Sequence, residues 1–297
     1  MKGNVPPEQL IDRLAAALMV APCLLLLAVF AYRPVVRSIQ LSLFGSDLLG
    51  RPTRFVGFQH YVELVTDPTL RQVLSTTVTI AVLSVVLATG GALAAALPLR
   101  RAAARARPVV SLILSLPFAY SAAAASAAFA GLFAPAVGTL NRVLADLGVV
   151  GPAWLESSGW AVVSISVATA WYEFGFAFLV LLASLSRVDP DVLEAAALDG
   201  AGEWRTAWSV VVPAVRPSLL FLVVTQTITG LQVFTQVQVL TRGGPSGSTT
   251  TLVYELYQRA FGAGLPAYGR ASTIALVLLT LVLAVTVVQL RLTRERP

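Results

Sequence analysis

The 297-residue chain is divided into long apolar runs separated by shorter polar stretches. Within the runs, apolar and polar residues do not repeat with the period of a half-exposed helix or strand. Six apolar runs are each long enough to cross a hydrocarbon core of about 30 Å, which takes about 20 helical residues. The pattern therefore predicts an all-α polytopic membrane protein with six transmembrane helices in a single domain, residues 1–297. The six predicted spans cover roughly residues 14–31, 74–99, 109–133, 159–185, 218–240 and 271–290.

Composition supports the membrane assignment. Apolar residues make up 57% of the chain and charged residues only 12%, whereas soluble domains carry about 25% charged residues. So few charges cannot cover a water-facing surface, which excludes a soluble globular protein, a disordered chain and a nucleic-acid binder. The first apolar run is longer than the core of a secretory signal peptide, so we interpret it as a retained membrane anchor.

Loop charges predict the orientation. If the N-terminus lies inside, Lys and Arg are roughly twice as dense in the inner loops as in the outer loops, as the positive-inside rule requires. Both termini are therefore predicted to be cytoplasmic. Cys23 is the single cysteine and His60 the single histidine, which excludes a disulfide framework or a thiolate metal site within the chain.

The inner loop at residues 186–217 is long and patterned. Asp189 is typical of a helix N-cap, and Pro190 loses nothing at the first helical position, where its missing N–H would be unpaired. Gly200 suits the left-handed position that ends a helix. A second short helix is expected over residues 202–211, ended by Pro213 before the fifth span. The loop therefore reads as a helix–turn–helix hairpin.

Two interpretations of this hairpin are open from the residues alone. It is either an amphipathic connector that rests on the membrane surface or a docking element that fits a groove on a cytoplasmic partner. Both uses require an apolar helix face, and the three alanines that follow Glu194 leave the backbone accessible in either case.

The stretch Glu194–Ala201, followed by Pro213, resembles the EAA loop of ATP-binding-cassette (ABC) importer permeases. The resemblance extends over nearly the whole chain to the permeases for sugars and glycerol phosphate compounds. Further matching stretches are Tyr32–Pro34, Ser42–Phe44, Phe55–Phe58, Gly138–Asn141, Trp154–Leu155, Leu240–Pro245, Ser248–Thr250 and Tyr257. Two positions depart from the family pattern, since a Phe is usual where Ala207 stands and an Asn is common where His60 stands.

The resemblance implies a type I ABC importer permease fold in the bacterial plasma (inner) membrane, and a docking role for the hairpin. A cytoplasmic ATPase present in two copies would use ATP and Mg²⁺, and this chain would bind no cofactor. A homologous second permease would complete the pore as a heterodimer, and an extracytoplasmic solute-binding protein would deliver the substrate. The residues assigned to ATPase coupling are Glu194, Ala195, Ala196, Asp199, Gly200, Ala201, Trp204 and Pro213.

Glu173 is the only charged residue deep in a predicted span, where a charge is costly and usually functional. It either contacts substrate or pairs with a basic residue of the second permease. The resemblance places Tyr172, Glu173 and Phe176 along the substrate path. It adds four positions of the fifth span, Gln226, Thr229, Gly230 and Val233.

We expect a carbohydrate-like solute. The stretch that begins at Ser248 favours the glycerol phosphate branch, and a carboxylate beside aromatic rings suits a cationic head group, as in a glycerophosphodiester such as glycerophosphocholine. A neutral disaccharide of the maltose or trehalose type is the alternative. A polytopic membrane enzyme is a remote alternative, because only one carboxylate lies in a span. A secondary carrier would usually show internal repeats and more spans.

Overall fold

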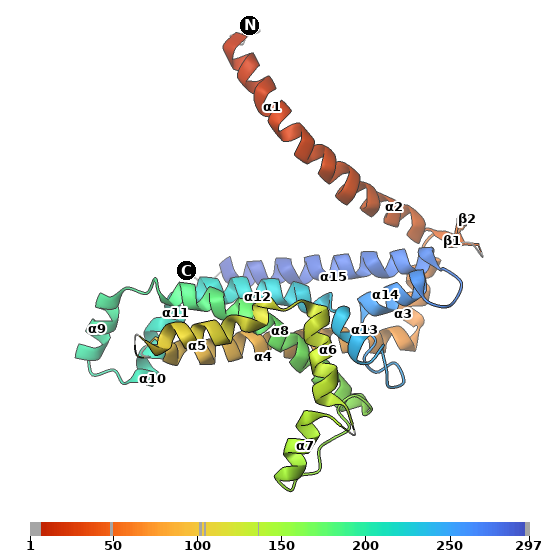
Figure 1. The fold of residues 1–297 in the computed structure, drawn as a ribbon. Coiled ribbons are helices and arrows are strands. Elements are labelled where there is room, and N and C mark those ends of the chain that lie inside the picture. Colours follow the sequence, from red (N-terminus) through yellow and green to blue (C-terminus); the bar gives the residue numbers. More distant parts are fainter. Residues whose placement is uncertain (1–6, 48–49, 101–102, 104, 136, 295–297) are drawn as a thin grey trace.

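The computed structural model describes residues 7–47, 50–100, 103, 105–135 and 137–294, and these are mostly helical (Figure 1). Short segments of other helix types are the π-helix η1 (Ala28–Tyr32), the 3₁₀-helix η2 (Leu116–Ala119) and the π-helix η3 (Ala207–Val211). The α-helices are α1 (Pro7–Leu27), α2 (Arg33–Ser42), α3 (Gln59–Thr66), α4 (Pro68–Leu99), α5 (Ala106–Ser115), α6 (Ala122–Phe133), α7 (Thr139–Asp146), α8 (Ser158–Leu185), α9 (Pro190–Leu198), α10 (Glu203–Thr206), α11 (Val212–Ala214), α12 (Arg216–Leu231), α13 (Thr235–Leu240), α14 (Leu252–Phe261) and α15 (Tyr268–Arg294).

Four stretches are long and apolar enough to cross a membrane as single helices, and the number rises to six if each of two bent pairs is one span. The four are Ala17–Ser42, Pro68–Leu99, Ser158–Leu185 and Tyr268–Arg291. The last three contain the second, fourth and sixth predicted spans, whereas the first overlaps the predicted span at residues 14–31 and continues beyond it to Ser42. Both chain termini, predicted to be cytoplasmic, lie outside the described residues.

The third and fifth apolar runs differ from continuous helices. The third is bent by 101° between Ala119 and Ala122, because Ser121 is extended and its hydroxyl caps α6 by accepting a hydrogen bond from the Ala124 N–H. The fifth stops at Leu231 and resumes at Thr235. The Thr251 hydroxyl donates to the Val233 carbonyl at 2.9 Å, so a distant side chain satisfies the backbone exposed by this second break.

The core lies where α4, α8 and α12 pack side by side. In this core, Ala92 and Ala96 of α4 pack against Phe178 and Leu181 of α8 and Leu222 of α12. All five side chains are fully buried. Small residues on α4 allow the helix backbones to approach closely, as is usual in membrane bundles. These three helices form the frame from which the other elements project.

The N-terminal helix stands away from this frame. In Figure 1, α1 points away from the bundle, while α2 packs on α15. The side chains from Ala17 to Val36 are exposed, including Leu25 and Phe30. A short antiparallel hairpin follows, in which β1 (Phe44–Ser46) pairs with β2 (Pro52–Phe55). Apolar side chains that the described part of the chain leaves exposed, as at Leu25 and Phe30, are suited to lipid or to another subunit.

Candidate functional site

The coupling hairpin begins as the sequence predicts. The Asp189 carboxylate caps α9 by accepting from the Asp191 N–H at 3.0 Å, and Pro190 occupies the first turn. Asp191 and Glu194 lie in the N-terminal half of the helix, where the helix dipole favours a negative charge. Local sequence signals alone are therefore sufficient to start this helix.

Gly200 ends α9 in the left-handed conformation, with φ at +74°. The Ala201 N–H donates to the Ala196 carbonyl and the Gly200 N–H to the Ala197 carbonyl, at 3.0 and 3.1 Å. This pair of bonds is a Schellman motif, which requires the left-handed residue that Gly supplies at no steric cost. The turn therefore has the geometry that the sequence predicts.

The second limb of the hairpin is longer than predicted. It consists of α10, a π-helical turn and α11, so Pro213 lies within the limb and does not end it. The π-helical turn directly before Pro213 already departs from the regular hydrogen-bond pattern, so the missing N–H breaks no regular bond. The limb ends at Val215, and the chain bends by 68° into α12.

The hairpin presents its side chains outward. Glu194, Ala195, Asp199 and Pro213 are exposed, and Ala196 and Ala201 are half-buried. Apolar side chains are also exposed there, notably Leu198 at 85% and Trp204 at 76%. Figure 1 shows α9 and α10 projecting beyond one end of the helix frame. An exposed helix with small residues and free apolar side chains is suited to a groove on another protein.

On α8, Tyr172, Glu173 and Phe176 are all half-buried. The Phe176 ring lies between Phe118 and Phe221, with ring centroids 5.9 and 6.5 Å apart. Among the described residues, the structure gives the Glu173 carboxylate neither an ion pair nor a hydrogen bond. An internal salt bridge therefore does not account for this carboxylate, and both of its predicted uses remain.

Gln226 is 2% exposed and joins three helices. Its side-chain carbonyl accepts from the Thr89 hydroxyl at 2.6 Å, and its amide donates to the backbone carbonyl of Glu173 at 3.4 Å. This arrangement is that of an internal tie between α4, α8 and α12. Sequence reasoning missed Thr89, whose only signal is a hydroxyl within a long apolar run.

The other fifth-span candidates divide into two groups. Gly230 and Val233 are buried, and a Cβ on Gly230 would lie 2.9 Å from the Ala81 Cα, so this glycine lets α12 approach α4. Thr229 is exposed, and its hydroxyl donates to the Thr225 carbonyl within the same helix. Thr229 is thus the residue of this group whose side chain faces away from the packed core.

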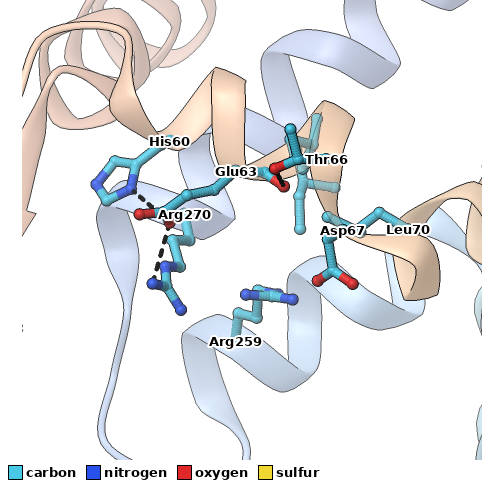
Figure 2. Close-up of a pocket in the computed structure, with 9 residues that line it drawn as sticks. His60, Glu63, Thr66, Asp67, Leu70, Arg259 and Arg270 are labelled. Atoms are coloured by element: carbon cyan, nitrogen blue, oxygen red, sulfur yellow. Dashed lines mark hydrogen bonds and ion pairs between the residues drawn. The ribbon is translucent and has the colours of Figure 1, made fainter.

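A cluster of polar residues lies at the end of the helix frame opposite the hairpin (Figure 2). A cavity of about 290 Å³ is lined there by polar residues of α3, α14 and α15, by Asp67 at the N-cap of α4, and by apolar residues that include Leu70. The Arg270 guanidinium is 3.0 Å from the Glu63 carboxylate, and His60 Nδ1 is 3.8 Å from the same group. Arg259 on α14 pairs with Glu255 of the same helix at 2.7 Å. The cluster holds α3 against α15.

The exposed hairpin, the bent spans and the helix frame together reproduce the features expected of an importer permease. Residues 88–295 match the family described as "Binding-protein-dependent transport system inner membrane component". The chain belongs to this family. This permease is therefore an inner-membrane ABC transport component, and its relatives are permease subunits whose ATPase is a separate protein.

Curated relatives match almost from end to end. The sulfoquinovosyl glycerol transport system permease protein SmoG of Agrobacterium fabrum is 34% identical over 96% of this chain and 92% of its own length. The lactose permease protein LacF of Rhizobium radiobacter is 32% identical, with 94% of each chain covered. The sn-glycerol-3-phosphate permease protein UgpA of Agrobacterium fabrum is 29% identical, with 96% of each covered. These relatives are permeases of sugar and glycerol phosphate transport systems, and identities of 29–34% leave the solute of this chain open.

Solved structures confirm the fold. A chain of a bacterial alginate ABC transporter, crystallised with an alginate-bound periplasmic protein, superposes with a TM-score of 0.84 over 97% of this chain and 96% of that one, at 20% identity. A second structure of an alginate importer gives a TM-score of 0.82 over 98% of both chains, at 21% identity. The type I ABC importer permease fold predicted from the sequence is thus confirmed.

Proposed function

We propose that this permease forms half of the translocation path of an ATP-driven importer for a carbohydrate-like solute, either a glycerol phosphate or glycerophosphodiester or an oligosaccharide. The hairpin at residues 186–217 transmits ATPase closure to the helix frame. The observation that carries the proposal is α9, a capped helix with exposed small residues that ends in a Schellman turn at Gly200. The second limb of the hairpin leads directly into α12, so a displacement of α9 is transmitted to the helix core.

The same proposal includes the partners. A homologous second permease completes the pore, two copies of a cytoplasmic ATPase use ATP and Mg²⁺, and this chain holds no cofactor. An extracytoplasmic binding protein delivers the solute. Support for that protein comes from the family description and from the similar alginate transporter, which was crystallised with a periplasmic protein. The exposed apolar side chains between Leu18 and Leu27 of α1 support a second subunit, since the described part of this chain leaves them uncovered.

For the substrate, the half-buried Glu173 is the informative residue. A carboxylate without a partner among the described residues of its chain repels a phosphate but attracts a cationic group, and the nearby Tyr172 and Phe176 rings add cation–π contact. A glycerophosphodiester with a choline head group satisfies both this carboxylate and the likeness to glycerol phosphate permeases. A neutral disaccharide is the second candidate, supported by the likeness to a lactose permease protein.

The test is Glu173→Gln, which keeps the size and hydrogen bonding of the side chain but removes its charge. Losing one partly desolvated charge contact costs about 1–3 kcal/mol, or roughly 5- to 150-fold in affinity. Uptake of a choline-bearing diester should fall by such a factor, while uptake of an uncharged analogue should be retained. Glu156→Gln, which removes the same charge from an outer loop, is the matched control.

Thermal melting of the permease heterodimer separates the two uses of Glu173. Equal loss of both substrates together with a lower melting temperature shows that Glu173 pairs with the second permease. That result would contradict a role for Glu173 in binding substrate. Selective loss of the cationic substrate with unchanged melting supports it.

A further inference from the structure

An apolar groove opens at the cytoplasmic end of the helix frame, outside the proposed substrate path. Its volume is about 430 Å³, and it lies between the last turns of α4 and the second limb of the hairpin. The lining residues are Gly90, Leu93, Ala94, Leu97, Pro98, Arg100, Glu203, Trp204, Thr206, Ala207 and Trp208. Apart from Arg100, Glu203 and Thr206, these side chains are apolar or amphipathic.

The groove exists because small residues face each other across it. Gly90 and Ala94 lie one turn apart on α4, and Ala207 begins the π-helical turn on the other side. A Cβ added to Gly90 would meet no atom within 4 Å, so there is open space directly above this position. Two larger side chains frame the space, since Trp204 and Trp208 contact each other with ring centroids 5.6 Å apart.

The position of the groove points to lipid. Val82 and Val86, 55% and 63% exposed, continue the face of α4 that carries Gly90 and Ala94, and none of these four residues is polar. Such a face suits hydrocarbon better than a solute path. α4 ends at Leu99, so the groove lies at the depth where the acyl layer meets the head groups. Tryptophan pairs are enriched at that depth.

The size of the groove and the charged residues beside it indicate which kind of molecule occupies it. An apolar cavity of about 150 Å³ is large enough to bind benzene, so this groove has room for a longer stretch of hydrocarbon. Arg100 and Glu203 carry opposite charges on the two sides of the groove, so Arg205, exposed on the same limb as Glu203, supplies the positive charge for an anionic head group. Basic residues next to the cytoplasmic membrane surface attract anionic lipids.

We propose that the groove binds an acyl chain of an anionic phospholipid from the cytoplasmic leaflet. The bound chain fills the space between α4 and the coupling hairpin, and so joins the hairpin to the frame. Val211 and Val215 of the second limb already share a buried cluster with Leu99 of α4. Beside this cluster, α4 and the second limb face each other across the groove, and a filled groove transmits displacement better than an empty one because apolar contacts replace the void.

The experiment uses the whole importer complex in nanodiscs that contain phosphatidylglycerol with a photoactivatable diazirine at the end of one acyl chain. After illumination, mass spectrometry maps the labelled peptides. We expect label on the segments that line the groove, and an excess of unlabelled phosphatidylglycerol should compete it away. Gly90→Leu, which fills the open space, should remove most of this label.

Gly131→Leu is the matched control, because Gly131 is an exposed glycine of α6 whose added Cβ also meets no atom within 4 Å. It should keep wild-type labelling of the groove. Label that Gly90→Leu leaves unchanged, or that unlabelled lipid does not displace from the wild-type complex, overturns the proposal. In a Cys23→Ala background, a cross-link from Ala94→Cys to the second permease through a thiol- and amine-reactive cross-linker, with no lipid label, overturns it as well by showing that a protein covers the groove.

Discussion

At the scale of single residues, the hairpin depends on one backbone conformation. Gly200 has φ at +74°, and a Cβ added there would meet no other atom within 4 Å. Substitution is therefore opposed by backbone strain alone, which for a β-branched residue is about 1–2 kcal/mol or more.

We expect Gly200→Val to abolish solute-stimulated ATPase activity and uptake while the chain still inserts and assembles. Gly200→Asn is the conservative control, because Asn tolerates the left-handed region better than any β-branched residue. Glu194→Lys, which reverses a charge on the exposed docking helix, should uncouple the complex in the same way. Wild-type coupling in both Gly200→Val and Glu194→Lys would show that α9 does not dock the ATPase.

Gln226 provides the second residue-scale prediction. Gln226→Leu removes the acceptor of the buried Thr89 hydroxyl, and leaving that hydroxyl without its partner costs about 1–3 kcal/mol of stability. Thr89→Val together with Gln226→Leu should cost less than the sum of the single changes, because neither buried polar group is then orphaned. Melting of the purified complex measures both effects, with Thr225→Val as the control. Strict additivity would argue that the two side chains act independently.

At the scale of elements, the cluster in Figure 2 holds α3 against α15 through Glu63. Burial raises the pKa of Glu63, but the hydrogen bond from Gln59 and the positive charge of Arg270, together with His60, outweigh burial and lower the pKa below its ordinary value. A lowered folded-state pKa means that the ionised form stabilises the fold. That stabilisation is present above the unfolded-state pKa and is lost as the pH falls through the folded value.

Glu63→Gln should therefore lower the melting temperature of the complex at pH 7, and the difference from wild type should shrink as the pH falls below about 4. The effect is small, because more than a third of the side chain is exposed and solvent screens the pair. Asp146→Asn on α7 removes a carboxylate elsewhere on the protein and serves as the control. A difference that grows in acid would contradict the proposed role of this ion pair.

At the scale of the whole molecule, the hairpin and the polar cluster of Figure 2 lie at opposite ends of the frame. The positive-inside rule assigns the hairpin end to the cytoplasm. The loop between α13 and α14 must then lie outside. In this loop Ser246 is exposed, whereas Ser186, also exposed, lies at the hairpin end.

In a Cys23→Ala background, a membrane-impermeant thiol reagent should label Ser246→Cys in intact cells. Ser186→Cys should be labelled only after lysis. The two sites match in residue type and exposure, so they differ only in the side of the membrane. The reverse pattern would invert the topology.

The sequence by itself determined the features that depend on neighbouring residues. Long apolar runs predict membrane helices because the hydrocarbon thickness sets their length, and Asp189 and Gly200 specify the ends of α9 because caps act over one turn. Its likeness to known permeases predicted the family, which the comparisons confirm. The ATPase-coupling and substrate-path roles assigned to individual residues stay predictions.

Only the tertiary structure decided which side chains meet across helices. Thr89 and Gln226 are 137 positions apart, and nothing local in either run marks them as partners. The same holds for the break at Val233, whose carbonyl is satisfied by Thr251, and for the groove between Gly90 and Ala207. The hydrophobic periodicity of a sequence shows only which face of a single helix is buried, not which helix packs against it. The pairing of helices depends on close packing between distant segments, so these contacts become visible only once the chain is folded.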